Sequence, residues 1–203
     1  MSDARRITTL IVPGLNGSGP DHWQTWLEAR IEGARRVVQA DWATPDLPRW
    51  AAEVGRAIEA ASGRIVLVAH SFGCLASVTA ASRHADRIAG ALLVAPADPA
   101  KFGVAALLPH QPLGYPGVLV ASRDDPWVAF GTARHWAGRW GCRFIDLGEK
   151  GHVNAESGFG PWPEGHALWA RLVGHDVRPV RPFVRDRLPA GPRSITALQE
   201  TQT

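Results

Sequence analysis

The sequence is poor in several features that define whole classes of protein. It has two cysteines in 203 residues, Cys74 and Cys142, which are too few for a disulfide-stapled scaffold and lack the spacing of a metal site. We expect both thiols to be reduced and buried, as in a cytoplasmic protein. The longest uncharged run, Phe102–Ser122, contains three prolines, a histidine and a glutamine, which do not suit a lipid-exposed helix. The sequence therefore predicts no transmembrane segment and no membrane partner.

Charge is also scarce, and its excess lies at one end of the chain. Charged residues make up 20% of the sequence, and the formal net charge is +3. Residues 176–203 hold five arginines against three acidic residues, which leaves +1 for residues 1–175. The basic balance thus describes a terminal segment and not a face that binds nucleic acid. We expect a folded domain over 1–175 and a Pro- and Arg-rich tail over 176–203.

What the chain does contain is a regular alternation of two hydrophobic patterns. Short runs that are largely apolar on both faces are typical of strands buried in a parallel sheet, and longer stretches with apolar residues at helical spacing lie between them. The predicted strands cover 7–12, 37–40, 65–69, 91–95, 118–121 and 144–147, and the predicted helices cover 21–31, 47–60, 72–83, 128–139 and 163–173. This alternation predicts an α/β fold in layers, with right-handed crossovers between the strands.

The strongest functional signal lies where the third predicted strand meets a helix. Ala69-His70-Ser71-Phe72-Gly73 has the small-x-Ser-x-Gly form of a nucleophile elbow, with alanine at the position where glycine is commoner. Small residues two before and two after the serine let neighbouring backbone come close and raise the hydroxyl above the sheet. The competing interpretation is a chance serine in a strand–helix loop, because short motifs of this kind recur.

Two later loops supply the partners that such a serine needs. Asp125 follows the fifth predicted strand, and His152 follows the sixth. The order Ser, Asp, His is that of α/β-hydrolases, and the carboxyl ends of parallel strands meet at one edge of a sheet. We expect His152 to take the proton of Ser71, and Asp125 to orient the imidazole. Asp124 and Asp98 are the alternative acids.

Acyl transfer also needs N–H donors for the negative charge that develops on oxygen. The backbone N–H of Phe72, directly after the serine, is one expected donor. The second is expected from the glycine-rich loop after the first strand, at Leu15 or Asn16. The same loop follows the general pattern of a dinucleotide fingerprint, but its glycine spacing is wrong, and the Gly-Lys-Ser/Thr of a phosphate loop is absent. We therefore expect no cofactor and no metal.

Aromatic residues supply the candidates for substrate contact. Nine tryptophans are many for this length, and most fall at helical spacing, where core packing is expected. Trp127 and Trp162 lie beside the acid loop and the histidine loop, so we expect them to line the substrate pocket. His22 is a further candidate for substrate contact. A packing role is the alternative for all three.

These motifs together resemble a known family. The segments that carry the resemblance are Ile11-Val12-Pro13-Gly14 through Asp21-His22-Trp23, the elbow, Asp124-Asp125-Pro126, and Gly151-His152-Val153-Asn154 with the residues that follow it. Over roughly residues 5 to 174 they are similar to the YdeN / retinoblastoma-binding-protein-nine family of small serine hydrolases. The resemblance implies a three-layer α/β-hydrolase fold, with about six parallel strands in the order 2-1-3-4-5-6, helices on both faces and no substantial lid. It also implies a triad of Ser71, Asp125 and His152.

The sequence supports one leading function and two alternatives. The leading hypothesis is a metal-free serine hydrolase that cleaves small carboxylic esters, or amides, through an acyl-enzyme, with a small acyl substrate as its partner. The short connection from Pro96 to Tyr115 leaves little room for a cap, so we expect an open pocket suited to short acyl groups. The first alternative is a module of the same fold that binds a protein partner without catalysis, although such a module has no chemical need for a complete triad. The second is acyl transfer to an acceptor other than water.

Overall fold

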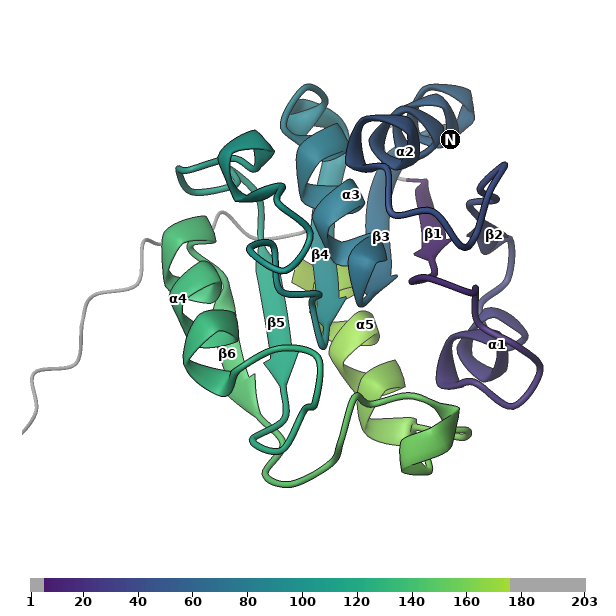
Figure 1. The fold of residues 1–203 in the computed structure, drawn as a ribbon. Coiled ribbons are helices and arrows are strands. Elements are labelled where there is room, and N and C mark those ends of the chain that lie inside the picture. Colours follow the sequence, from purple (N-terminus) through teal and green to yellow (C-terminus); the bar gives the residue numbers. More distant parts are fainter. Residues whose placement is uncertain (1–5, 176–203) are drawn as a thin grey trace, which may run out of the picture.

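Six parallel strands form a single sheet at the centre of the protein (Figure 1). The computed structural model describes residues 6–175, so the expected tail over 176–203 lies outside the described residues. The strand order is β2-β1-β3-β4-β5-β6, which confirms the predicted α/β fold and its topology. The strands are β1 Ile7–Val12, β2 Arg35–Arg36, β3 Arg64–His70, β4 Ile88–Val94, β5 Gly117–Ala121 and β6 Arg143–Asp146.

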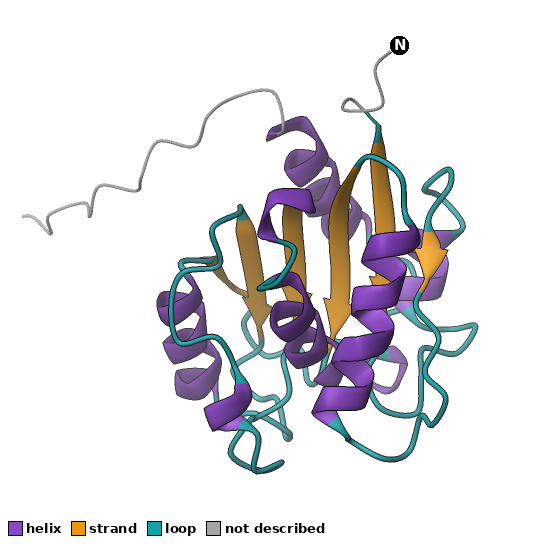
Figure 2. Ribbon diagram, turned by 90° about the horizontal axis from the view of Figure 1, so that it is seen from above, coloured by secondary structure: helices purple, strands orange, loops and turns teal. Residues whose placement is uncertain are grey.

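Helices cover both faces of this sheet (Figure 2). One core cluster joins one face of the sheet to α2, α3 and α4, and a second cluster joins the opposite face to α1 and α5. The helices are α1 Trp23–Glu28, α2 Leu47–Ala60, α3 Phe72–Ala81, α4 Phe130–Trp140 and α5 Pro163–His175, with the short 3₁₀ helices η2 Ala85–Arg87, η3 Ala105–Leu107 and η4 Ala155–Ser157. The chain therefore forms the three layers expected of it.

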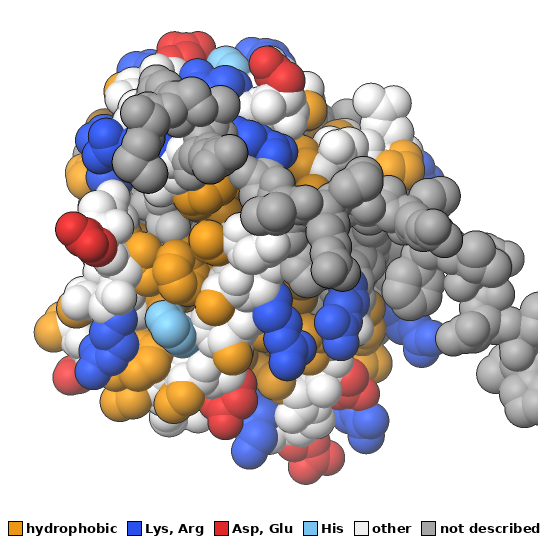
Figure 3. Space-filling model, turned by 180° about the vertical axis from the view of Figure 1, so that it is seen from behind, with side chains coloured by type: hydrophobic (Ala, Val, Ile, Leu, Met, Phe, Trp, Pro, Cys, Tyr) orange, Lys and Arg blue, Asp and Glu red, His pale blue; other side chains and the backbone are white. Residues whose placement is uncertain are grey.

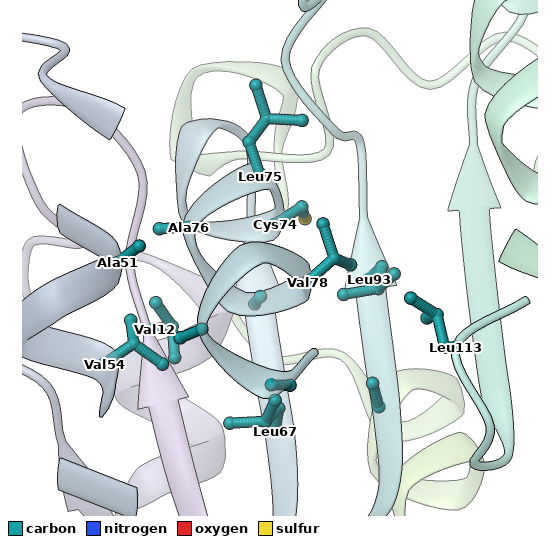
Figure 4. Packing of buried hydrophobic residues seen from close by; sticks show 14 of the residues in the cluster. Val12, Ala51, Val54, Leu67, Cys74, Leu75, Ala76, Val78, Leu93 and Leu113 are labelled. Carbon is teal, nitrogen blue, oxygen red and sulfur yellow. The ribbon is translucent and has the colours of Figure 1, made fainter. Parts of the chain in front are cut away.

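Helix α3 lies against the sheet and packs beside α2 on the same face (Figure 4). Nine of its ten residues are buried, so it has no polar face. Val78 points towards Leu93 of β4, while Ala76 lies near Ala51 of α2. Each fully buried Val or Leu contributes about 1.5–3 kcal/mol relative to an exposed one. This packing fixes the start of α3 against the ends of β1 and β3.

The edge strand β2 is where the strand prediction was wrong. The predicted strand at 37–40 is replaced by a two-residue ladder, Arg35–Arg36, that pairs with β1. Val37 N–H still donates to the carbonyl of Ile11 at 2.8 Å, but Val38 is 64% exposed and the chain then leaves the sheet. An edge strand is hydrogen-bonded on one side only, so its apolar residues need not enter the core.

The carboxyl edge of the sheet carries no large cap in the described residues. The segment between β4 and β5 contains η3 as its one helical element, which agrees with the expectation of little or no lid. No helix within residues 6–175 is both long enough and apolar enough to cross a membrane.

The face seen from behind exposes hydrophobic side chains between lysine and arginine side chains (Figure 3). Half-buried Trp26 of α1, together with Leu168 and Trp169 of α5, packs against the core cluster of that side of the sheet. Trp169 also donates its indole N–H to the hydroxyl oxygen of Thr9 at 2.9 Å, which ties α5 to β1.

Candidate active site

Ser71 stands on a strained turn between β3 and α3. Its φ is +52° and its ψ is −125°, a conformation that non-glycine residues rarely adopt and that a nucleophile elbow requires. A Cβ on Gly73 would lie 2.6 Å from the carbonyl oxygen of Val12, and a Cβ on Gly14 would lie 2.7 Å from Cβ of Ser71. Both glycines are therefore needed for the loop after β1 to pass this close to the turn.

Three side chains from distant loops form a hydrogen-bonded chain at this turn. His152 Nε2 lies 2.9 Å from Ser71 Oγ, and His152 Nδ1 lies 2.9 and 3.0 Å from the two carboxylate oxygens of Asp125. The Asp125 side chain is fully buried, and the His152 side chain is 9% exposed. Because a carboxylate only accepts, Nδ1 carries the proton and Nε2 accepts from the serine hydroxyl. This arrangement is able to withdraw the proton of Ser71 as the oxygen attacks an electrophile.

The two alternative acids are placed elsewhere. Asp124 accepts from the hydroxyl of Ser122 at 2.6 Å and from two backbone N–H groups of the loop before His152, at 2.7 and 2.8 Å. These hydrogen bonds, that of Ser122 first, lower the pKa of the Asp124 carboxyl. Asp98 accepts from the backbone of Ala100, within its own loop, at 3.0 Å. Among the three carboxylates, Asp125 is the one hydrogen-bonded to the imidazole.

Two backbone N–H groups next to the turn that carries Ser71 lack partners in the described part of the chain. They belong to Phe72, the first residue of α3, and to Leu15, in the loop that Gly14 brings against Ser71. The N–H of Asn16 donates to the carbonyl of Trp42 at 2.9 Å. Of the two predicted donors in this loop, the N–H of Asn16 is therefore already bonded, and that of Leu15 is the one without a partner among the described residues.

The aromatic candidates separate into one surface residue and two buried ones. Trp127 is 59% exposed, and its ring centroid lies 6.4 Å from that of His152. Trp162 is 5% exposed and packs edge-on against Trp23. His22 is also 5% exposed, and its Nδ1 caps α1 by accepting from the N–H of Gln24. Trp162 and His22 are thus nearly covered, which favours the packing role for both, and their place in the substrate pocket stays a prediction.

Sequence reasoning missed a second set of contacts, which lies under the histidine loop. His70 Nε2 is 2.9 Å from the carbonyl oxygen of His152, and Trp23 Nε1 is 2.9 Å from the carbonyl oxygen of Val153. Burial holds the pKa of His70 well below its usual range. Burial first, and then the charge of Arg36, lowers the pKa of His22 to about 4. The one sign of these contacts in the sequence was that His22, Trp23 and His70 lie within the segments that carry the family resemblance.

Other reactive or hollow features do not belong to this site. Within residues 6–175 no group of three His, Cys, Asp or Glu side chains is placed to hold a metal ion. Cys74 and Cys142 are unpaired, and burial raises the pKa of both thiols, which makes them poor nucleophiles. A groove between α2 and α3, lined by Ala51, Gly55 and other residues, contains none of the three hydrogen-bonded residues.

Comparison with known proteins places the chain in a family. The sequence profile of the serine hydrolase family matches residues 9–171. The chain belongs to the serine hydrolase family. A YdeN-like hydrolase from Pectobacterium atrosepticum is 36% identical, with a TM-score of 0.81 over 86% of this chain and 94% of that one. No curated protein matches the chain.

More distant structures share the fold of this serine hydrolase. The ydeN gene product of B. subtilis is 19% identical, with a TM-score of 0.69 over 83% of this chain and 100% of that one. Est1E of Butyrivibrio proteoclasticus, solved with ferulic acid, is 12% identical, with a TM-score of 0.64 over 85% and 88% of the two chains. The family match and the 36% identical YdeN-like hydrolase together confirm the resemblance to YdeN-like hydrolases and the assignment as a hydrolase.

Proposed function

We propose that this serine hydrolase cleaves small carboxylic esters through an acyl-enzyme on Ser71. The observation that carries the proposal is the 2.9 Å contact between Ser71 Oγ and His152 Nε2, with Asp125 on the far side of the imidazole. Such a chain gives a serine hydroxyl a base at one end and an anion that stabilises the resulting imidazolium at the other.

In the first half of the reaction, Ser71 Oγ attacks the acyl carbon while its proton passes to His152 Nε2. The carbonyl oxygen becomes an oxyanion, and we assign its binding to the N–H groups of Phe72 and Leu15, the first residue of α3 and the residue after Gly14. The carbon–oxygen bond to the leaving group then breaks, and the proton on Nε2 goes to the leaving oxygen, so that an alcohol departs. Ser71 is left as an ester of the acyl group.

In the second half, water takes the place of the alcohol. His152 accepts a proton from the water as its oxygen attacks the acyl-enzyme, and the new tetrahedral intermediate uses the same two N–H groups. When it collapses, the proton returns to Ser71 Oγ and a carboxylic acid is released. Acyl transfer would follow the same steps with another acceptor in place of water.

The surroundings of the triad favour a small ester bound in an open site. No large cap covers the carboxyl edge of the sheet within residues 6–175, so little structure is available there to enclose a long acyl chain. Trp127 is exposed on the His152 side, and His152 delivers the proton to the leaving group. We therefore assign the Trp127 indole to contact with the leaving group.

The remaining parts of the proposal concern partners and location. Every step above uses groups of this chain and a small acyl substrate, and none calls for a metal, a cofactor or nucleic acid. The two unpaired cysteines suit a reducing compartment, which supports a cytoplasmic location.

A fluorophosphonate tests the proposal directly, because it forms a stable adduct with an activated serine. Intact-mass analysis of the wild type should show a single adduct, and Ser71→Ala should show none while keeping its fold. Ser82→Ala is the matched control, because Ser82 lies at the far end of α3 with its hydroxyl bonded to the Thr79 carbonyl. It should react as the wild type does.

Two results would contradict the proposal. An adduct that persists in Ser71→Ala would place the reactive serine elsewhere. A folded wild type that neither reacts nor hydrolyses p-nitrophenyl acetate would favour the non-catalytic binding module instead.

A further inference from the structure

Two buried ring N–H groups hold the backbone that carries His152. One belongs to His70, at 2.9 Å from the carbonyl oxygen of His152, and the other to Trp23, at 2.9 Å from the carbonyl oxygen of Val153. Because a carbonyl oxygen only accepts, Nε2 of His70 must carry its proton. Two consecutive carbonyls of this loop are therefore each fixed by a side chain from a distant part of the sequence.

The backbone at this point is strained and needs such support. Val153 has a φ of +49°, in the left-handed region that a β-branched residue rarely adopts. Strained residues persist where the surrounding structure holds them. The two donors fix the peptide groups on both sides of the Val153 Cα, and so they also fix the direction in which the His152 side chain leaves the loop.

His70 also links this loop to the nucleophile. It is the last residue of β3, directly before Ser71, and it contacts a residue 82 positions later in the chain. The ring centroids of His70 and His152 lie 4.8 Å apart. One strand end thus fixes both the serine hydroxyl and the backbone of its base, and the 2.9 Å between Ser71 Oγ and His152 Nε2 depends on both attachments.

A neutral donor suits this position better than a charged one. His152 becomes positive each time it accepts the Ser71 proton, and a cation beside it would oppose that step. The titratable groups facing His70 are His152 and His22, and burial keeps the pKa of His70 well below its ordinary range. His70 therefore donates its hydrogen bond without adding positive charge, which lysine or arginine could not do.

We propose that His70, with Trp23 beside it, is a positioning residue that holds His152 in register with Ser71. The inference rests on the function proposed for Ser71 and His152. Both residues act through the loop backbone and not on the substrate, so their loss should lower kcat and leave KM for a small ester nearly unchanged.

A pair of substitutions at His70 separates its hydrogen bond from its bulk. His70→Gln offers an amide N–H close to the position of Nε2, and His70→Leu offers none. With p-nitrophenyl acetate, His70→Leu should lower kcat by about 10- to 100-fold, because a small misplacement of a catalytic group has effects of that order. His70→Gln should stay within about fivefold of the wild type. KM should change by less than about twofold in both variants.

The pH profile separates positioning by His70 from its taking part in the titration of the site, and the kcat-against-KM split with recovery in His70→Gln separates positioning from a merely structural role. If His70 only positions His152, the acidic limb of kcat/KM in His70→Gln should coincide with that of the wild type. A shifted limb would overturn the inference, because His70 would then take part in the titration itself. Undiminished kcat in folded His70→Leu would overturn it too, as would an equal loss in folded His70→Gln and His70→Leu.

A matched pair of tryptophan variants keeps the test decisive if His70→Leu does not fold. Trp23→Phe removes the N–H that holds Val153, and Trp169→Phe removes the N–H that binds Thr9. Trp23→Phe should lower kcat by about tenfold and Trp169→Phe by less than about twofold. Equal kcat values for the two would overturn the inference. Failure of the function proposed for Ser71 would give a different result from either kcat outcome. In that case the wild type itself would react with neither the ester nor the fluorophosphonate.

Discussion

Asp124 and Asp125 are neighbours in the sequence, but their surroundings differ. The Asp125 side chain is fully buried and accepts from His152 Nδ1 and from the backbone N–H of Trp127, both at 2.9 Å. Asp124 is exposed, and it accepts from the backbone N–H groups of Lys150 and Gly151. On this geometry one carboxylate orients the imidazole, and the other orients the loop that carries it.

Replacement of each aspartate by asparagine should separate these two roles. Asp125→Asn should lower kcat for p-nitrophenyl acetate by about 10³- to 10⁴-fold, because an amide that donates to Nδ1 favours the wrong tautomer of His152. Asp124→Asn keeps one oxygen for the two N–H groups, so its kcat should fall by about tenfold or less. Steady-state kinetics of the two variants decide the matter, and equal losses would contradict the assignment.

The meeting of Ser71, Asp125 and His152 could be predicted because local rules suffice for it. Each follows a strand of the same sheet, and parallel strands end at the same edge of a sheet. The positions of Asn16 and Trp162 could not be predicted in the same way. Whether a backbone N–H is free, or an indole is covered, depends on partners far away in the sequence, such as the Trp42 carbonyl for Asn16.

Among the elements, the turn from β3 into α3 depends on a single small residue, Gly73. A Cβ on Gly73 would meet the carbonyl groups of Val12 and Pro13, which belong to backbone that cannot move aside without displacing β1. Gly138, within α4, offers the opposite case, since a Cβ there would meet nothing within 4 Å. The two glycines therefore form a matched pair for substitution by alanine.

Gly73→Ala should destabilise the protein by about 1–3 kcal/mol, as overpacking of a close contact does. It should also lower the rate of fluorophosphonate labelling, because the displaced elbow carries Ser71. Gly138→Ala should stabilise the protein by up to about 1 kcal/mol, because alanine favours a helix interior. Urea unfolding of both variants measures these effects. A Gly73→Ala variant as stable and as reactive as the wild type would show that the turn tolerates a methyl group.

The strands themselves differ in how well the sequence predicts them. β3 and β4 pair on both edges and are buried on both faces, so an unbroken apolar run predicts them to within three residues at either end. β2 pairs with β1 alone, and its two residues are arginines. The bounds of such a strand depend on its hydrogen bonds to one neighbour and not on burial. The hydrophobic pattern of the sequence therefore does not predict them.

At the scale of the whole molecule, the layer between the sheet and α1 contributes both to the stability of the fold and to the support of the proposed active site. The cluster between the sheet and α1 contains Trp23 and Trp162, and His22 and His70 lie against it. Buried neutral histidines of this kind make the stability of the fold depend on pH, because the unfolded chain binds protons that the folded chain excludes. The supports of the active site should therefore weaken in acid even where the carboxylates remain ionised.

His22 allows this dependence to be measured. Its pKa is lowered from 6.5 to about 4 in the folded protein, so between these values the unfolded state binds more protons and the stability falls as the pH falls. Between pH 7.5 and pH 5 this histidine should remove about 2 kcal/mol from the free energy of unfolding. His22→Asn keeps a side-chain acceptor for the N–H of Gln24 at the start of α1 but does not titrate. Urea unfolding at the two pH values should therefore show a loss about 2 kcal/mol smaller in His22→Asn than in the wild type. An identical loss in both proteins would mean that His22 takes up its proton in the folded state as readily as in the unfolded one.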